Sequence, residues 1–428
     1  MRLSLTVVGG LLLTGGLACP AKRPTSTTSV TTPSASPTED VVSSTSISEE
    51  PSQTTSVDVT TAPTTEAQPT STSSTAKVEE PSSTSASASS TSASSSAAPS
   101  PTTIVRTYPA DVVDKLRDSS IDKLKDYLSK NPAGSCTLEN ASIRREWSDI
   151  SPKEREEYIA AVKCLQSKSP RTASSKGPGV RSRFDDFVAT HIEQTDYIHN
   201  TANFLSWHRY YVHAYEKALR DECGYAGFQP YWNWDRYAKD PANSPLFNGN
   251  ASSLGGNSVN GGCVQSGPFK DMSVNLGPGT SLGYNPRCLK RAISKQWAAQ
   301  TTADHTISLI TQSRDIVSFQ DTMQSYGGVH TGGHFTIGGD PGGDIHTSPG
   351  DPAFYLHHAM IDRVWWIWQM QDLSARLKAV GGTVVGSRGR SGSASDPINL
   401  GVNGDAITIG DMLTTMGGLN GELCYIYV

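Results

Sequence analysis

The sequence predicts a mainly α-helical domain with long loops and a few short strands. Apolar residues recur at a spacing of three or four in several stretches between residues 112 and 371, as on one face of a helix. Helix-start signals, in which Ser or Asp is followed directly by Pro, precede two of these stretches. Residues 240–285 are rich in Gly, Asn, Pro and Ser and predict loops.

The first predicted helices lie at residues 112–130 and after Ser151. The motif SPKE predicts a capping box, with Ser151 as N-cap, Pro152 in the first position and Glu154 hydrogen-bonded back to the cap. We interpret this second helix as structural.

The next helices are predicted over residues 185–194 and 202–224. In the second, Phe204, Trp207, Tyr211 and Tyr215 form an apolar stripe, and a glycine at position 224 predicts its end. The aromatic run PYWNWD at 230–235 is expected to fold inward.

The C-terminal half predicts one helix over 305–324, a glycine-rich segment over 327–344 and a strong helix start at DPAFYL. There Asp351 is expected to cap the helix and Pro352 to occupy its first position. Short strands are expected within 407–416 and 422–428.

The N-terminal residues predict secretion. Residues 1–18 resemble a signal peptide, and 19–104 are dominated by Ser, Thr, Pro and Ala, as in a disordered stalk with O-linked glycans; an unmodified linker is the alternative. Residues 105–428 then form one folded domain, outside the cell, either free or associated with the cell wall through the stalk. The net charge of −5 gives no indication of a nucleic-acid or membrane partner.

A secreted chain permits disulfides and glycans. Of the seven cysteines, Cys19 falls at the cleavage region, and the other six allow 15 pairings, among which the sequence does not choose. Asn140 and Asn250 begin glycosylation sequons.

All ten histidines lie between His191 and His358, which indicates one site built from a few segments or a shared core. His191, His199 and His208 come from two predicted helices and their junction. His213 lies five residues after His208, about 140° around the helix, and so cannot share its metal.

A second histidine group strengthens the prediction of a metal site. His330 and His334 share one face if their segment is helical, and His357 and His358 are adjacent. Asp362 follows four residues later, where a carboxylate could orient a ligating imidazole. Six imidazoles without a Glu-x-x-His motif argue against a carboxylate-bridged di-iron centre, but copper, zinc and iron all remain.

These residues carry a resemblance to the tyrosinase family. HNTANFLSWHRYYVHAYE (199–216) resembles its first copper signature, and DPAFYLHHAMID (351–362) resembles the second, with VHTGGH before it. The resemblance covers about 135–427 and is greatest to the short secreted fungal members. It implies a bundle of about four helices that holds two copper ions. The implied ligands are His191, His199 and His208 for one ion, and His330, His334 and His358 for the other.

The resemblance also implies roles for other residues. His357 is expected to neighbour the site, Phe354 to pack against a ligand ring, and Asp362 and Arg209 either to pair beneath the site or to make separate contacts. His213, and likewise His305 and His346, are expected to be structural.

The implied activity is the oxidation of o-diphenols to o-quinones, with O2 reduced to water. Thr331 stands where an Asn is associated with monophenol hydroxylation in the family, so we expect that monooxygenase activity to be weak or absent. Tyr197 stands where many fungal members carry a crosslinked cysteine, so we expect no such crosslink. We also expect no covering C-terminal domain after the Tyr-x-Tyr motif at 425–427.

Three alternatives remain at this point. The chain could be a full tyrosinase that also hydroxylates monophenols, a haemocyanin-like oxygen-binding protein, or a secreted binding or wall protein with an inactive site. The presence of all six expected ligands argues against the last.

Overall fold

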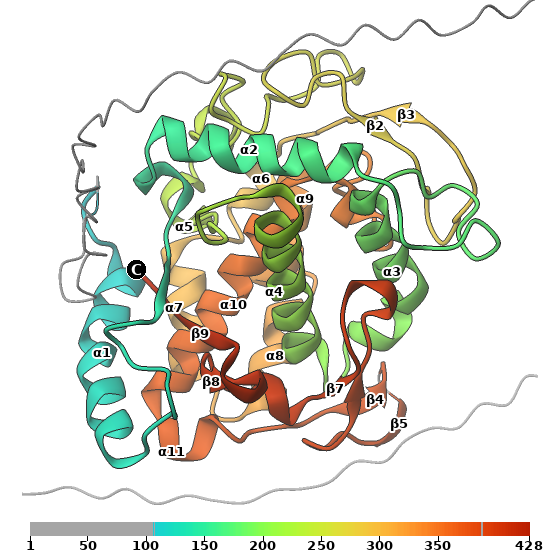
Figure 1. The fold of residues 1–428 in the computed structure, drawn as a ribbon. Coiled ribbons are helices and arrows are strands. Elements are labelled where there is room, and N and C mark those ends of the chain that lie inside the picture. Colours follow the sequence, from blue (N-terminus) through green and yellow to red (C-terminus); the bar gives the residue numbers. More distant parts are fainter. Residues whose placement is uncertain (1–105, 107, 387) are drawn as a thin grey trace, which may run out of the picture. The chain divides into compact units, whose positions relative to one another are not determined.

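The computed structural model describes residues 106, 108–386 and 388–428, all within one compact unit (Figure 1). The predicted signal peptide and stalk lie outside the described residues. In the part of the chain that is described, no helix is both long and apolar enough to cross a bilayer.

Helices dominate the described residues, as predicted. They are α1 (Val112–Lys130), α2 (Pro152–Ser167), α3 (Arg183–Ile198), α4 (Phe204–Cys223), α5 (Trp234–Tyr237), α6 (Lys295–Ala298), α7 (Ala303–Gln312), α8 (Ile316–Gln324), α9 (Val329–Ile337), α10 (Ala353–Gln371) and α11 (Leu373–Arg376).

Local sequence sets the ends of several helices. α2 begins with the predicted capping box of Ser151 and Glu154, and α3 with a second box formed by Ser182 and Asp185. α4 ends at Gly224, whose φ of 69° is the left-handed conformation that glycine adopts without strain.

One predicted helix is divided in the structure. The expected single helix over 305–324 is two helices, because Ser313 ends α7 and Asp315 caps α8 through a box with Ser318. The carbonyl of Ser313 accepts a hydrogen bond of 3.0 Å from the Trp368 indole, which stabilises the break.

α10 begins one residue later than expected. Its N-cap is Pro352 rather than Asp351, although Asp351 still accepts a hydrogen bond from the Ala353 backbone at 2.9 Å. The Asp351 carboxylate also forms a buried ion pair with Arg291, at 2.7 Å.

The core is centred on α10, which is buried along nearly its whole length. It packs against α4, with α1, α7 and α9 beside it (Figure 1). Trp365 and Trp368 of α10 are buried, as are Tyr231, Trp232 and Trp234 of the aromatic run that was predicted to fold inward.

Short strands complete the fold. β1 (Ser142–Arg144) pairs in parallel with β9 (Leu423–Tyr427), and β8 (Met416–Gly418) pairs antiparallel with the other edge of β9. Three two-stranded sheets join β2 (Ser273–Val274) to β3 (Arg287–Cys288), β4 (Thr383–Val385) to β5 (Arg388–Ser391), and β6 (Pro397–Ile398) to β7 (Ile407–Thr408).

Three disulfides join segments of this domain, and they use all six cysteines that follow Cys19. The pairs are Cys136–Cys424, Cys164–Cys223 and Cys263–Cys288. The first holds the chain near β1 to β9, and the second joins α2 to the end of α4. The sequence alone left this pairing open.

Candidate metal centre

Four helices carry the histidines that were predicted to bind metal. His191 lies on α3, His199 is the residue that ends α3, and His208 lies on α4. His330 and His334 lie on α9, and His358 lies on α10. The segment of 330–334 is therefore helical, which was the condition for its two imidazoles to share one face.

The first group, His191, His199 and His208, brings one ring nitrogen of each residue within 4.8 Å of the others. In each residue Nδ1 donates to a backbone carbonyl. His191 donates to His346 at 2.9 Å, His199 to Thr195 at 2.9 Å, and His208 to Phe204 at 2.8 Å. These bonds place the proton on Nδ1 and leave the lone pair on Nε2.

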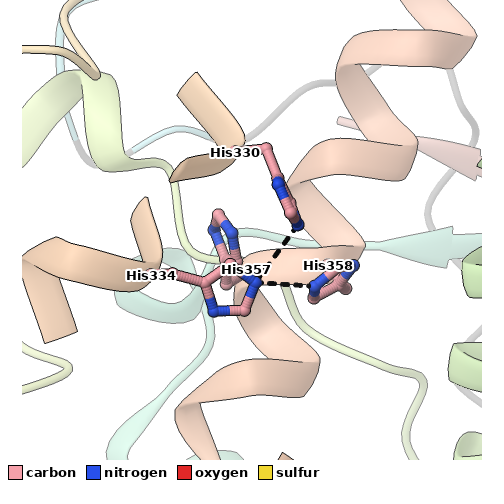
Figure 2. Close-up of side chains that lie close together, drawn as sticks. All are labelled: His330, His334, His357 and His358. Carbon is pink, nitrogen blue, oxygen red and sulfur yellow. Dashed lines mark hydrogen bonds between the residues drawn. The ribbon is translucent and has the colours of Figure 1, made fainter. Parts of the chain in front are cut away.

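The second group contains His330, His334, His357 and His358. Nε2 of His334 lies 3.2 Å from Nε2 of His330 and 3.1 Å from Nε2 of His358 (Figure 2). Nitrogens bound at about 2.0 Å to one tetrahedral metal ion stand about 3.3 Å apart. The three imidazoles therefore fit a single shared metal ion.

His357 belongs to this cluster but has a different setting. Its ring lies 5.0 Å from that of Trp234, and it faces Gly333 of α9 so closely that a Cβ there would be 2.2 Å from its Cε1. Only glycine lets α9 approach α10 at this point. The structure thus places His357 among the residues of the second group.

The two groups adjoin each other. The rings of His208 and His358, one from each group, stack with centroids 4.4 Å apart. Phe354 contacts both groups, because its ring stacks on His358 at 4.1 Å and meets the edge of His191 at 5.4 Å. The buried phenyl ring thus packs against an imidazole of each group.

The imidazoles remain neutral at ordinary pH. Burial lowers the pKa of His199 to about 4 and that of His357 to about 3. Burial, reinforced by the neighbouring imidazoles, holds the pKa values of His191, His208, His330, His334 and His358 well below 6.5. Neutral imidazole is the form that binds a metal.

Asp362 has a different position from the one expected. Its carboxylate accepts hydrogen bonds from Arg209 at 2.6 Å, Tyr425 at 2.7 Å and Tyr427 at 2.5 Å, rather than from a histidine of the described residues. Of the two alternatives for Asp362 and Arg209, pairing or separate contacts, the structure has the pair, which is buried. This contact joins α4, α10 and β9 beneath the histidines.

The remaining predicted residues lie around the centre. Thr331 donates its hydroxyl to the Gln324 carbonyl at 3.2 Å. His213 lies outside both groups, with Nε2 3.9 Å from Glu422, and exposed His305 bonds through Nδ1 to Thr302. His346, expected to be structural, supplies the carbonyl that orients His191.

Sequence reasoning missed three kinds of contribution to the centre: the backbone carbonyls of His346, Thr195 and Phe204, the close approach at Gly333, and the contact of Thr331 with Gln324. A glycine pair inside His-x-x-x-His is a signal for the second. Backbone carbonyls carry no sequence signal, so the first could not be found.

Comparison with known proteins identifies the same region. The profile of the common central domain of tyrosinase matches residues 181–371. The tyrosinase-like protein orsC of Emericella nidulans is 39% identical over 298 residues, which is 59% of this chain and 80% of that protein. N-acetyl-6-hydroxytryptophan oxidase ivoB of the same organism is 35% identical over 347 residues, covering 68% and 93% respectively.

A solved structure is similar in fold as well as in sequence. A polyphenol oxidase variant from Thermothelomyces thermophila superposes with a TM-score of 0.69 at 39% identity, covering 74% of this chain and 97% of that one. The family and this neighbour imply a dicopper site, and the two groups of imidazoles fit it. The chain belongs to the tyrosinase family and is a copper oxidoreductase of the phenol oxidase type.

Proposed function

We propose that this protein is a dicopper oxidase that converts o-diphenols to o-quinones while O2 is reduced to water. His191, His199 and His208 would hold one copper ion, and His330, His334 and His358 the other. The observation that carries the proposal is the pair of adjoining, neutral imidazole groups, whose ring nitrogens converge at distances suited to a shared metal.

Copper ions held there would exchange electrons with O2 and with the phenol. The chain itself supplies the environment for that exchange. Carbonyl groups fix the tautomers of the first imidazole group, Phe354 packs against both groups, and burial keeps the imidazoles unprotonated. Rigid neutral ligands suit a copper ion in both of its oxidation states.

Hydroxylation of a monophenol is expected to be weak, because it needs a group that takes the phenol proton near the metal. The hydroxyl of Thr331 donates to the Gln324 carbonyl. Gln320 donates its amide to the Gly381 carbonyl at 2.8 Å, and the upstream Asp321 is exposed. None of these side chains is arranged as a base toward the histidines, which supports diphenol oxidation as the main reaction.

The test is to load the full chain with copper and measure bound copper, O2 uptake and quinone formation from catechol and from phenol. We expect about two copper ions per chain and faster initial rates with catechol. Uptake of O2 without quinone would favour an oxygen carrier, and a chain that binds no copper would contradict the proposal.

A full tyrosinase is the second candidate, because relatives bear that name. Thr331→Asn tests it directly. If the unaltered chain hydroxylates phenol as fast as it oxidises catechol, and the substitution changes neither rate, then Thr331 has no part in substrate selection.

We infer that the chain is secreted, with residues 1–18 removed and 19–104 forming a stalk ahead of the catalytic domain. The tract holds few apolar residues with which to join a core. A chain beginning at Thr103 should therefore melt at the same temperature and oxidise catechol at the same rate as the longer one. A lower melting temperature would show that the tract packs on the domain.

The two sequons differ in how a glycan would fit. The Asn140 amide nitrogen donates to the Ser135 carbonyl at 2.7 Å, whereas Asn250 is bonded through Oδ1 to Ser252 and its amide nitrogen bonds to no described residue. We expect Asn250 to carry the glycan. Peptide mass spectrometry after enzymatic deglycosylation, which converts a glycosylated Asn to Asp, would contradict this if only position 140 were converted.

A further inference from the structure

Gln324, the last residue of α8, contacts the residue that directly follows one histidine in each group. Its side-chain Oε1 accepts the backbone N–H of Asn200, which follows His199, at 2.8 Å. Its backbone carbonyl accepts the hydroxyl of Thr331, which follows His330, at 3.2 Å. Gln324 thus links the two histidine groups through the residues that follow His199 and His330.

The two histidines joined in this way face each other across the centre. The rings of His199 and His330 have centroids 5.9 Å apart and are inclined by 34°. His199 lies where α3 ends, and Asn200 has a φ of 53°, a left-handed conformation uncommon outside glycine. The hydrogen bond that the Asn200 N–H donates to Gln324 therefore holds this turn, which lies beyond the end of α3.

α8 is held in place by hydrogen bonds and by packing against α10. Gln324 also donates to the Gln320 carbonyl at 3.2 Å, and Gln320 donates in turn to the carbonyl of Gly381. Phe319 of α8 stacks on Trp368 of α10, with centroids 5.0 Å apart. Because α10 carries His358, the packing of α8 on α10 fixes the position of Gln324 relative to the second histidine group.

We propose that Gln324 is a positioning residue that sets the spacing of the two copper ions, an inference that rests on the proposed dicopper function. The contact acts through Asn200 and Thr331, so its loss should alter the relation between the two groups more than it alters the number of ions bound. Small displacements of reacting groups are enough to reduce a catalytic rate strongly.

The experiment compares Gln324→Met, which keeps the length but removes the acceptor, with Gln324→Glu, which retains an acceptor for Asn200. Gln312→Met, at the exposed end of α7, is the matched control. Each protein is loaded with Cu(II) and examined by metal analysis and electron paramagnetic resonance (EPR), and kcat and KM for catechol are measured. Two closely coupled Cu(II) ions cancel each other's EPR signal, whereas separated ions do not.

We expect Gln324→Met to bind about two copper ions, to gain an EPR signal and to lose about tenfold in kcat. Gln324→Glu and Gln312→Met should remain EPR-silent like the unaltered chain. The proposal is overturned if Gln324→Met stays EPR-silent with unchanged kcat, or if Gln324→Glu gains the same signal.

Two further measurements separate folding and function from positioning. The melting temperature of each metal-free protein should match that of the control, and a fall that accounts for the loss of activity would overturn the proposal. If Gln324→Met does not fold, Thr331→Val removes the other contact, and an EPR-silent Thr331→Val would overturn it too. An unaltered chain that fails to bind two coupled ions would instead refute the dicopper function.

Discussion

Replacement of Asp362 by asparagine should destabilise the domain strongly, because it removes the negative charge at a buried junction. Arg209, Tyr425 and Tyr427 donate to this carboxylate, and Arg144 lies 3.4 Å from it. Asparagine keeps the shape, but it leaves the fully buried Arg209 guanidinium with only neutral acceptors.

The expected size follows from burial rather than from distance. Loss of one partner of a buried ion pair costs about 3–5 kcal/mol, since the other charge is left uncompensated. The pair of Arg287 and Asp340 has the same separation of 2.6 Å, but its side chains are 16% and 34% exposed. Solvent reaches both side chains of this second pair, which weakens it relative to a fully buried pair. Asp362→Asn should therefore lower the free energy of unfolding by about 3–5 kcal/mol, and Asp340→Asn by less.

Urea denaturation of the metal-free proteins, with disulfides intact, measures both changes. Burial raises the pKa of Asp362, but Arg209, Arg144 and the two tyrosine hydroxyls outweigh it, and the net pKa is lowered. A lowered carboxyl pKa contributes stability above the unfolded value of about 3.9, and this is lost as the pH falls through the folded value. The difference should thus be constant between pH 5 and 8. Equal losses for Asp362→Asn and Asp340→Asn would refute this reasoning.

Three further predictions concern the histidines. His208→Ala should reduce bound copper to about one ion per chain and abolish turnover, whereas His213→Ala should leave about two; equal losses would contradict the ligand assignment. Gly333→Ala places a Cβ 2.2 Å from a rigid imidazole, so it should lower the free energy of unfolding by about 1–3 kcal/mol and prevent binding of the second copper ion. In the control Gly327→Ala, the new Cβ has its nearest neighbour at 3.6 Å, and neither quantity should change. Denaturation and metal analysis measure the two quantities. Finally, the metal-free domain should lose stability as the pH falls from about 6.5 towards about 4, the pKa of the buried His199. In this range the histidines of the unfolded chain bind protons, whereas the buried imidazoles of the folded chain stay neutral. A denaturation midpoint that does not change over that range would contradict this.

Much of the helical framework could be predicted from local sequence. Ser151 with Glu154, and the glycine that ends α4, act within one turn of the chain, so their effect is visible in a short window. The break between α7 and α8 was missed even though Asp315 and Ser318 form a capping box, because the apolar spacing continues through it.

The contacts made over long sequence separations could not be predicted. Arg144 reaches Asp362, 218 residues away, and β1 pairs with β9 at the opposite end of the domain. Nothing in the local sequence of either partner specifies the other. The same holds for the disulfides, where six cysteines permitted many pairings and only the fold brings each pair together.

At the centre, the sequence identified the histidines but not the groups that orient them. The motif spacing singled out the histidines, but the sequence suggested that Asp362 would orient one of them. In the fold, backbone carbonyls of Thr195, Phe204 and His346 orient the first group instead. The carboxylate pairs with the buried Arg209 and also lies near Arg144, whose shorter ion pair is with Glu216. A carbonyl fixes the tautomer of an imidazole without adding negative charge beside the metal. The carboxylate can therefore serve stability alone, and substitution of Asp362 should affect copper binding only as far as it unfolds the helices that carry His208 and His358.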